Sequence, residues 1–458
     1  MSPTSLPYVE LHCHSGFSFL DGASHPEELV LQAAELGYPA LALTDHDGLY
    51  GSMEFARAAR GAGIQPITGA EITLRDCFPG VPEPAEGYHV TLLAETPRGY
   101  ANLSRLLTES HMGAEERGRP SLPLPHLLKR TEGLILLTGC RKSPLLAALD
   151  SSVADGQAFL AQLLEAFGPG NVFAELQDNA VRGDGARIRS LARLAERMGV
   201  GVVATGNVHY HRKARHRLQD VLVAIRNRTT LDGAHAVRRP NRLFHLASPR
   251  EMTHRFRSRP EALSNTLHVA ERCAAFDLTE DLGYEFPDFE GSEHGGALET
   301  LEALCLAEIG KRYAPGSTQE RGARERLHTE LELVDLHGLA GFFLVYRDIM
   351  ELAREVAAEV RSGSPRARAG LPPGRGRGSS VSSIICYLIG LSHIDPVESD
   401  LFLGRFLNEA LRSVPDIDLD FPRDIREELI LRVYEKYGRE HTGLVCTFPT
   451  YRLRSAVR

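Results

Sequence analysis

The first 210 residues alternate between short apolar runs and amphipathic segments, and this alternation constrains the fold more than any other feature of the sequence. Seven apolar runs are typical of β-strands: 8–14, 39–45, 65–74, 88–94, 133–139, 171–177 and 201–207. Between most of them, apolar residues recur at three- and four-residue spacing, which predicts helices over 26–37, 53–63, 100–112 and 187–199. Because such alternation indicates parallel pairing, we expect an α/β fold whose seven strands form a closed or nearly closed barrel.

The rest of the chain has a different pattern. Residues 212–285 predict mainly helices and connections, and the acidic stretch 281–296, which carries Gly and Pro, predicts a linker. Helical patterns return over 297–360, and residues 361–378 then contain five Arg and no acidic residue. We therefore divide the chain into a first domain over 1–280, a linker over 281–296, a second region over 297–449 and a final segment over 450–458.

Composition places the chain among ordinary globular proteins, with 43% hydrophobic and 24% charged residues. The net charge of −8 argues against a surface that coats nucleic acid everywhere, but it leaves room for a local basic channel. Seven Cys without a CxxC pair predict a reduced, cytosolic setting. The N-terminus has no signal-peptide pattern, and the longest uncharged run is too short and polar to span a membrane. We expect a soluble, cytoplasmic protein with no membrane partner.

Side chains that commonly bind metals lie at or near the ends of the predicted strands. The carboxyl ends of barrel strands converge on one rim, where imidazole, carboxylate and thiolate groups would together suit Zn²⁺, Mn²⁺ or Fe²⁺. Any one of these residues alone is more often an ordinary surface or core residue. Their coincidence at five strand ends favours a metal cluster. The residues are His12, His14, Asp45, His46, Asp47, Glu71, His89, Cys140, Asn207 and His209.

A Gly/Arg loop precedes an apolar helical pattern in the second region. Gly376 and Gly378 would let the backbone approach a ligand closely, and Ser379 and Ser380 are expected to cap the helix that follows. The free N–H groups of that helix would then face an anion, and the arginines of the loop would add donors for phosphate oxygens. A flexible basic linker is the alternative interpretation of this stretch.

Three aspartates follow the loop at a spacing of two residues. Asp416, Asp418 and Asp420 alternate with apolar residues, so on a strand all three carboxylates would face one side. Carboxylates at such short separations repel one another unless cations lie between them. Opposite a triphosphate-binding loop they would form a two-Mg²⁺ site, whereas the simpler alternative is an acidic edge strand.

Six segments of the first domain carry a family resemblance: LHCHSGFSFLDG, ALTDHDGLYG, GAEI, YHVTLLA, LTGC and GNVHY. They resemble the PHP (polymerase and histidinol phosphatase) domain, in particular the version at the N-terminus of bacterial C-family DNA polymerases, the polymerase III alpha subunits. The resemblance implies a distorted seven-stranded barrel with up to three metal ions. The metal ligands that it implies are His12, His14, Asp21, His46, Glu71, His89, Cys140 and His209.

One position departs from the PHP pattern, because Asn207 stands where the family usually has an aspartate ligand. A neutral amide binds Zn²⁺ or Mn²⁺ more weakly than a carboxylate and neutralises none of the ion's charge. We therefore expect one metal subsite to be weakened or empty. Relatives with a complete cluster hydrolyse phosphodiesters, often as 3′–5′ exonucleases, so two interpretations stay open here: residual hydrolysis, or a structural brace.

The second region resembles the palm of the same polymerases, whose nucleotidyltransferase core is of the polymerase-β type. The resemblance rests on GRGSS followed by PDIDLDFP. Two further segments, CYLIGLSHIDPV and VYEKYGREHTGLVCTFPTYRLRSAVR, are most similar to the error-prone branch used in mutagenic repair synthesis. It implies a helical and mixed α/β partial palm. The family places Asp416 at a position that is not a metal ligand. The implied triphosphate-binding residues are Arg377, Gly378 and Ser379, and the implied catalytic residues, which bind Mg²⁺, are Asp418 and Asp420.

Family members continue through thumb, fingers and DNA-binding domains, with a third catalytic aspartate further along. The resemblance thus implies a partial palm over 297–449, the start of a thumb over 450–458, and inefficient polymerisation by this chain alone. The implied partners are primer–template DNA and deoxynucleoside triphosphates, while a sliding clamp and other subunits would bind later regions. We expect the N-terminal part of a DNA-directed DNA polymerase. Two alternatives are a stand-alone PHP phosphoesterase acting on a small phosphate ester and a non-catalytic scaffold.

Overall fold

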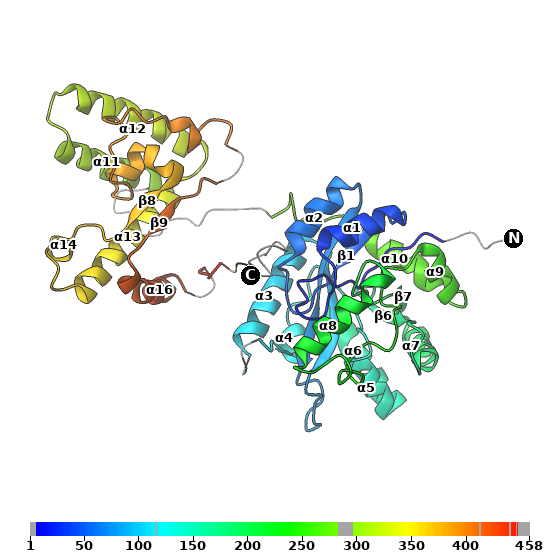
Figure 1. Cartoon of the computed structure of the whole chain (residues 1–458). Coiled ribbons are helices and arrows are strands. Elements are labelled where there is room, and N and C mark those ends of the chain that lie inside the picture. Colours follow the sequence, from blue (N-terminus) through cyan, green and yellow to red (C-terminus); the bar gives the residue numbers. More distant parts are fainter. Residues whose placement is uncertain are drawn as a thin grey trace. The chain divides into compact units, whose positions relative to one another are not determined.

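The computed structural model describes residues 6–114, 116, 118–282, 296–411, 414–438, 441–445 and 447. The chain divides into two compact units, Met1–Gly283 and Tyr284–Arg458 (Figure 1). Most of the predicted linker over 281–296, and all of the predicted thumb segment over 450–458, lie outside the described residues. Each unit is described by itself below.

One mixed sheet forms the centre of the first unit, and its helices surround it (Figure 1). All of the predicted strands except the first are present, and a short strand, β4, pairs with β2 in addition. The strands are β1 (Ala40–Leu43), β2 (Gln65–Arg75), β3 (Tyr88–Ala94), β4 (Leu122–Pro123), β5 (Leu134–Leu137), β6 (Val172–Gln177) and β7 (Gly201–Thr205).

The prediction of parallel pairing throughout the sheet is wrong for β3. The pairs β1–β2, β5–β6 and β6–β7 are parallel, whereas β3 runs antiparallel to both β2 and β5. The physical reason is the connection: residues 76–87, all of them described, form a loop without a helix, and neighbours joined in this way pair antiparallel. The reversal brings the first residues of β3 to the edge of the sheet where its parallel neighbours end.

The first predicted strand, 8–14, is extended but is not a regular strand. It makes two isolated bridges, from Glu10 to Leu41 of β1 and from Cys13 to Val208 beyond β7. Side chains replace part of the missing ladder, since the backbone N–H of Cys13 donates to Thr44 Oγ1 at 2.9 Å. The segment therefore bridges to β1 at one end of the sheet and to the residues that follow β7 at the other.

The helices of the first unit bury apolar residues at the spacing that the sequence shows. In α1, Leu29, Val30 and Ala33 are buried against the sheet core, and Pro26 occupies the first turn, where a proline costs no hydrogen bond. The helices are α1 (Pro26–Glu35), α2 (Ser52–Gly61), α3 (Pro97–Met112), α4 (Leu124–Leu127), α5 (Pro144–Ser151), α6 (Val153–Phe167), α7 (Asp184–Met198), α8 (His216–Arg226), α9 (Pro249–Arg255) and α10 (Pro260–Cys273).

The second unit is mainly helical, and its described residues contain one two-stranded antiparallel sheet, β8–β9. Its core gathers Phe343, Met350 and Ile385 with other apolar side chains. The elements are α11 (Ala297–Arg312), α12 (Thr318–Leu336), α13 (Ala340–Val360), α14 (Pro365–Arg368), β8 (Arg375–Arg377), α15 (Ile384–Leu388), β9 (Asp418–Asp420) and α16 (Arg423–Tyr437). The chain is thus a mixed α/β protein. Among the described residues, no helix has both the length and the hydropathy that a membrane span requires.

Candidate metal centre and active site

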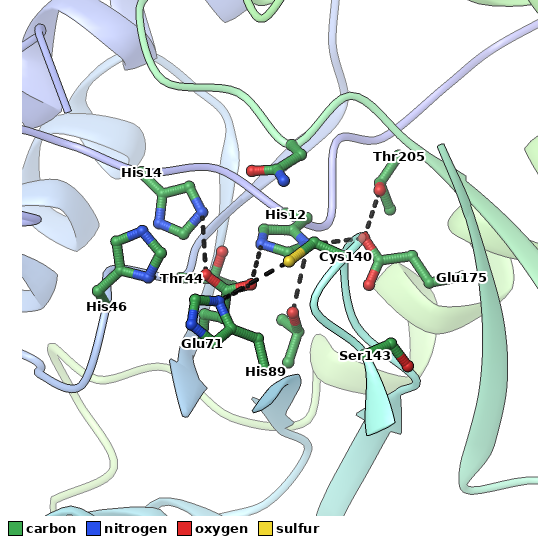
Figure 2. Close-up of polar contacts among 12 residues, drawn as sticks. His12, His14, Thr44, His46, Glu71, His89, Cys140, Ser143, Glu175 and Thr205 are labelled. Carbon is green, nitrogen blue, oxygen red and sulfur yellow. Dashed lines mark hydrogen bonds and ion pairs between the residues drawn. The ribbon is translucent and has the colours of Figure 1, made fainter. Parts of the chain in front are cut away.

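Six of the predicted metal ligands lie together at one edge of the first unit's sheet. Figure 2 shows five of them: His12, His14, His46, Glu71 and His89. They form three overlapping groups, and within each group the ligand atoms lie within 4.8 Å of one another. Glu71, His14 and His46 each belong to two of the three groups, and Glu71 is the one carboxylate among the six residues. The groups are His12 with His14 and Glu71, His46 with Glu71 and His89, and His14 with His46 and His209.

The fold explains why residues far apart in the sequence meet here. His12 and His14 are two residues apart on an extended segment, so their side chains point the same way. His46 follows β1 and bridges to Glu71 of β2 in parallel register. His89 is the second residue of β3, and it reaches the same edge only because β3 is antiparallel to its neighbours.

The carboxylate of Glu71 is surrounded by imidazole rings. Its Oε2 lies 2.7 Å from His46 Nδ1, and its Oε1 lies 3.2 Å from His89 Nδ1 and 3.4 Å from His12 Nε2. Burial raises the pKa of Glu71, but these histidines outweigh burial and hold the pKa well below its usual value. Glu71 therefore stays ionised and supplies a negative charge inside the protein.

Several ligand atoms of the cluster are buried and have no hydrogen-bond partner in the part of the chain that the structure describes. They are Nε2 of His12, His14 and His209, and Oε1 of Glu71. Buried polar atoms are normally paired, and leaving one unpaired costs about 1–3 kcal/mol. Imidazole nitrogens and a carboxylate oxygen that meet in this way fit a divalent cation such as Zn²⁺ or Mn²⁺. The arrangement is therefore a candidate metal centre.

Glu175 on β6 supports this centre from behind, and the sequence analysis missed it. Its Oε1 lies 2.6 Å from His12 Nδ1 and accepts hydrogen bonds from Thr205 Oγ1 at 2.5 Å and Gln177 Nε2 at 2.7 Å. Burial lowers the pKa of His12, but Glu175 and Glu71 outweigh burial and raise that pKa to about 10. A carboxylate behind a histidine orients the ring and strengthens it as a metal ligand. The one available signal was an acidic residue within the apolar run 171–177.

Asp21 lies beside the cluster but shares its carboxylate with other donors. Its Oδ2 is 3.3 Å from His46 Nε2 and 3.6 Å from His209 Nε2. Its Oδ1 accepts hydrogen bonds from Gln219 Nε2 at 3.0 Å and Arg239 Nη2 at 3.2 Å. Among the described residues, Asp21 joins none of the three ligand groups.

Cys140 and Asn207 border the cluster. Cys140 Sγ lies 3.7 Å from His89 Nδ1, and burial raises the pKa of this thiol well above its usual value. Asn207 adopts a left-handed backbone conformation, with a φ of 48°, and its carbonyl oxygen accepts a hydrogen bond from His209 Nδ1 at 2.8 Å. This bond leaves His209 Nε2 facing the cluster. The side-chain Oδ1 of Asn207 is buried and finds no hydrogen-bond partner among the residues that the structure describes.

The second unit brings the predicted loop and two of the three aspartates together. In the β8–β9 pair, Arg377 is the register partner of Asp418. Arg377 Nη1 lies 3.6 Å from Asp418 Oδ2, and its Nε lies 3.1 Å from Asp420 Oδ1. The side chains of Asp418 and Asp420 are 44% and 57% exposed, so solvent reaches both carboxylates. Asp416 lies outside β9.

The prediction that Ser379 and Ser380 cap a helix is wrong. A 3₁₀ turn over Gly378–Ser382 intervenes, and Ser383 caps α15, because its hydroxyl accepts from the backbone N–H of Cys386 at 3.1 Å. The first N–H groups of α15 are not free for an anion. Those of Ile384 and Ile385 donate to the buried carboxylate of Glu330 at 2.8 and 3.2 Å.

The two glycines of the loop serve different purposes. A Cβ on Gly376 would lie 2.9 Å from the carbonyl oxygen of Leu391, so this glycine permits close backbone packing within the unit rather than the approach of a ligand. Gly378 has a φ of +72°, which favours glycine, and it leads into the exposed Ser379. Gly378 and Ser379 therefore remain available to a ligand.

Comparison with known proteins agrees with this architecture. Residues 10–179 match the PHP domain, and residues 299–458 match the bacterial DNA polymerase III alpha NTPase domain. In these two regions the chain is similar to the PHP domain and to the bacterial DNA polymerase III alpha NTPase domain, respectively. It is 38% identical over 470 residues to an error-prone DNA polymerase of Symbiobacterium thermophilum, and 39% identical over 457 residues to one of Mycobacterium tuberculosis. Each alignment covers 99% of this chain, and the chain spans 40% of the length of each of these relatives.

Proposed function

We propose that the chain carries the N-terminal region of a DNA-directed DNA polymerase of the error-prone class, which adds deoxynucleotides to a primer 3′ end in repair or translesion synthesis. The observation that supports this proposal is the β8–β9 pair, which holds Arg377 beside Asp418 and Asp420. Carboxylates of this kind bind Mg²⁺ together with the phosphates of a substrate. The second unit would then be a partial palm of the polymerase-β type.

Each residue of this pair has a separate role in the proposal. Asp418 and Asp420 would hold two Mg²⁺ ions, which supply Lewis-acid stabilisation of the phosphates when bound. Arg377, the backbone N–H of Gly378 and the hydroxyl of Ser379 would bind the triphosphate. Arg377 already contacts both carboxylates, so a bound Mg²⁺ would displace its guanidinium from them. The displaced guanidinium would then be free to bind the phosphates of a triphosphate. We therefore expect Mg²⁺ and nucleotide to bind together.

Primer extension by the full-length protein tests this proposal. Asp418→Asn should abolish extension and leave the fold intact, whereas Asp416→Asn should retain it, because Asp416 is exposed and lies outside β9. Normal extension by the Asp418→Asn protein would contradict the assignment. So would an equal loss in both variants.

For the first unit, we propose metal-dependent hydrolysis of phosphodiesters, with the 3′ end of a DNA strand as substrate. The buried ligand atoms around Glu71 that lack a hydrogen bond from any described residue support this proposal. A bound Zn²⁺ or Mn²⁺ would supply Lewis-acid activation of water and of a phosphate oxygen. His12, His14, His46, Glu71 and His89 would hold the ions, and Glu175 would keep His12 oriented.

A distorted barrel would explain why these ligands converge. The extended segment 8–14 bridges to β1 at one end of the sheet and to the residues after β7 at the other, which supports closure of the sheet. His12 and His14 lie on that segment. The metal site and the closure of the sheet would then depend on the same residues.

An exonuclease assay on the purified chain tests hydrolysis, with a 3′-labelled DNA strand and added Mn²⁺ or Zn²⁺. Activity should require the metal and should be lost in His14→Gln, a variant that removes a buried ligand without removing charge. A chain that binds metal but releases no nucleotide would contradict the nuclease. It would favour a structural brace, the second candidate, which the neutral amide of Asn207 also supports. Release of phosphate from small esters alone would favour a phosphoesterase instead.

The partners in this proposal follow from the same chemistry. Primer–template DNA and deoxynucleoside triphosphates would bind the exposed Asp418 and Asp420 with the Gly/Arg loop, and a single DNA strand would enter the first unit. A sliding clamp and other polymerase subunits would bind the parts of the full-length protein that lie beyond this chain.

A further inference from the structure

One end of the metal centre differs electrostatically from the rest. Around Glu71 the neighbouring cationic groups are histidines, whereas Asp21 is approached by two arginines. Arg239 Nη2 lies 3.2 Å from Asp21 Oδ1, and Arg226 Nη1 lies 3.6 Å from Asp21 Oδ2. Gln219 Nε2 donates to the same carboxylate at 3.0 Å. Side chains of the protein therefore already contact both carboxylate oxygens of Asp21, and little of this carboxylate is left to bind a metal ion.

Arg239 is held in this position from two sides. Its guanidinium carbon lies 4.7 Å above the ring of Phe244, within the range of a cation–π contact, and the ion pair with Asp21 fixes its other side. Its side chain is 21% exposed. A fixed positive charge thus lies next to the carboxylate of Asp21.

The neighbouring position 207 fits the same arrangement. Asn207 carries no charge, and its Nδ2 donates to Gln177 Oε1 at 3.5 Å. An aspartate at this place would face the Gln177 oxygen without a donor. Gln177 donates through its Nε2 to Glu175 and so cannot easily turn around. A metal ion beside Asp21 would therefore find no carboxylate at position 207 to neutralise its charge, and Asp21 itself is already paired with arginines.

Behind Arg239 lies a polar pocket of about 500 Å³. Its lining includes Tyr210, His216, Arg239 and Arg242, and also Arg238 with Asp220, whose Oδ2 lies 3.2 Å from Arg238 Nη1. The hydroxyl of Tyr210 and the Nε atoms of Arg238 and Arg239 are buried and have no hydrogen-bond partner among the described residues. Such donors, with arginine charge beside them, fit the oxygens of a phosphate group.

We propose that the Arg239 guanidinium takes the place of a third metal ion at the Asp21 end of the centre. The centre would then hold two ions, with Glu71 among the ligands, and Arg239 would bind the phosphate of the substrate from the pocket. The second half of this proposal rests on the proposed phosphodiester hydrolysis. The first half concerns the number of ions alone.

Counting bound ions by elemental mass spectrometry, after loading with Mn²⁺ and gel filtration, tests the first half. We expect two ions per chain in the wild type and still two in Asn207→Asp, because Arg239 remains. The double variant Asn207→Asp with Arg239→Gln should bind a third. Arg239→Lys combined with Asn207→Asp keeps the charge and should stay at two. Circular dichroism and thermal unfolding verify that each variant is folded.

Three ions in the wild type, or a third ion gained by Asn207→Asp alone, would overturn the replacement of a metal by Arg239. A folded double variant that stays at two ions would overturn it as well. A wild-type chain that binds no metal would instead overturn the metal centre, and with it the proposed hydrolysis. The two failures are therefore distinguishable.

Titration of the Mn²⁺-loaded chain with inorganic phosphate, followed by calorimetry, tests the second half. Arg239→Gln should weaken phosphate binding at least ~10-fold, the loss of one charge-assisted contact. Arg217→Gln, an exposed arginine of α8 outside the pocket lining, is the matched control and should leave the affinity unchanged. Equal affinity of wild type and Arg239→Gln would overturn the phosphate contact.

Discussion

The two sites of this chain handle negative charge in opposite ways. In the first unit, Glu71 is 1% exposed and lies within 3.4 Å of nitrogens on three histidines. In the second unit, the side chains of Asp418 and Asp420 are about half exposed, and a single arginine contacts both. The first site is buried and built from many parts of the chain, and the second is open and built from two short strands.

This difference predicts when each site takes up its metal. A buried carboxylate has lost its hydration, so it needs compensating charge and hydrogen bonds from the protein or from a bound cation. Exposed carboxylates remain hydrated, and Mg²⁺ at such sites keeps several waters and depends on substrate phosphates for part of its binding. We infer that the metal of the first unit is resident and that the metal of the second arrives with nucleotide.

The largest expected effect contrasts the central carboxylates of the two sites. Glu71→Gln removes a ligand shared by two groups, so the affinity for resident metal should fall by more than the ~10–100-fold that supporting residues cost. Asp418→Asn should leave the resident metal unchanged. Elemental analysis of the two purified variants measures this contrast. An equal loss of metal in both variants would contradict the inference that the first unit holds its metal permanently while the second binds its metal only with nucleotide.

A smaller loss is expected from the support behind the first site. Glu175→Gln keeps the shape of the side chain but removes the charge beside His12 Nδ1, so metal affinity should fall by about 10–100-fold. Competition with a chelator of known affinity measures the change. Glu165→Gln, an exposed residue of α6, is the control and should behave as wild type. Wild-type affinity in Glu175→Gln would mean that His12 needs no such support.

The second unit has a buried carboxylate too, but it lies in the interior rather than in the open site. Glu330 accepts hydrogen bonds from the hydroxyl of Ser383 at 2.7 Å and from two backbone N–H groups at the start of α15. Glu330→Gln should therefore lower the free energy of unfolding by about 1–3 kcal/mol. Urea unfolding followed by circular dichroism measures it. Glu332→Gln, on the same helix with a 66% exposed side chain, should change it little.

A pH effect of smaller extent concerns a histidine of the first unit outside the metal centre. Burial lowers the pKa of His245 to about 4, so this ring is neutral in the folded protein, whereas in the unfolded chain it takes up a proton below about 6.5. The unfolded state thus binds more protons between these values, and stability should fall as the pH drops from 6.5 towards 4. Thermal unfolding of wild type and His245→Gln across this range should show a shallower fall in the variant. An equal fall in stability in both proteins would contradict a neutral, buried His245 as the cause.

Local patterns predicted much of the first unit. The alternation of apolar runs located six strands and four helices, because burial on a sheet or along a helix stripe imposes those periods. The same pattern predicted that His12, His14 and Glu71 would meet, since strand ends converge. It did not predict the direction of β3, which depends on the absence of a helix in the loop before it. The pattern thus predicted that His89 lies near the other ligands, but it also predicted parallel pairing for β3, which is antiparallel.

The residues that support the sites could not be predicted in the same way. Glu175 and Glu330 act through hydrogen bonds to residues 163 and about 54 positions away, respectively, and no local period reports such contacts. The N–H groups at the start of α15, which we predicted to be free for an anion, instead donate to Glu330, and no local period reports this contact either. Arg239 reaches Asp21 across 218 positions, so its effect on the metal centre became visible only in the fold.

Anomalous diffraction from crystals of the chain grown with Mn²⁺ tests the account most directly. We predict peaks beside Glu71, one towards His12 and His14 and one towards His46 and His89, with no peak between Asp21 and Arg239 and none at Asp418 without nucleotide. A peak at Asp21 would contradict the substitution of a metal by arginine. Crystals with no peak at Glu71 would contradict the central claim, that the first unit is built around a resident metal centre.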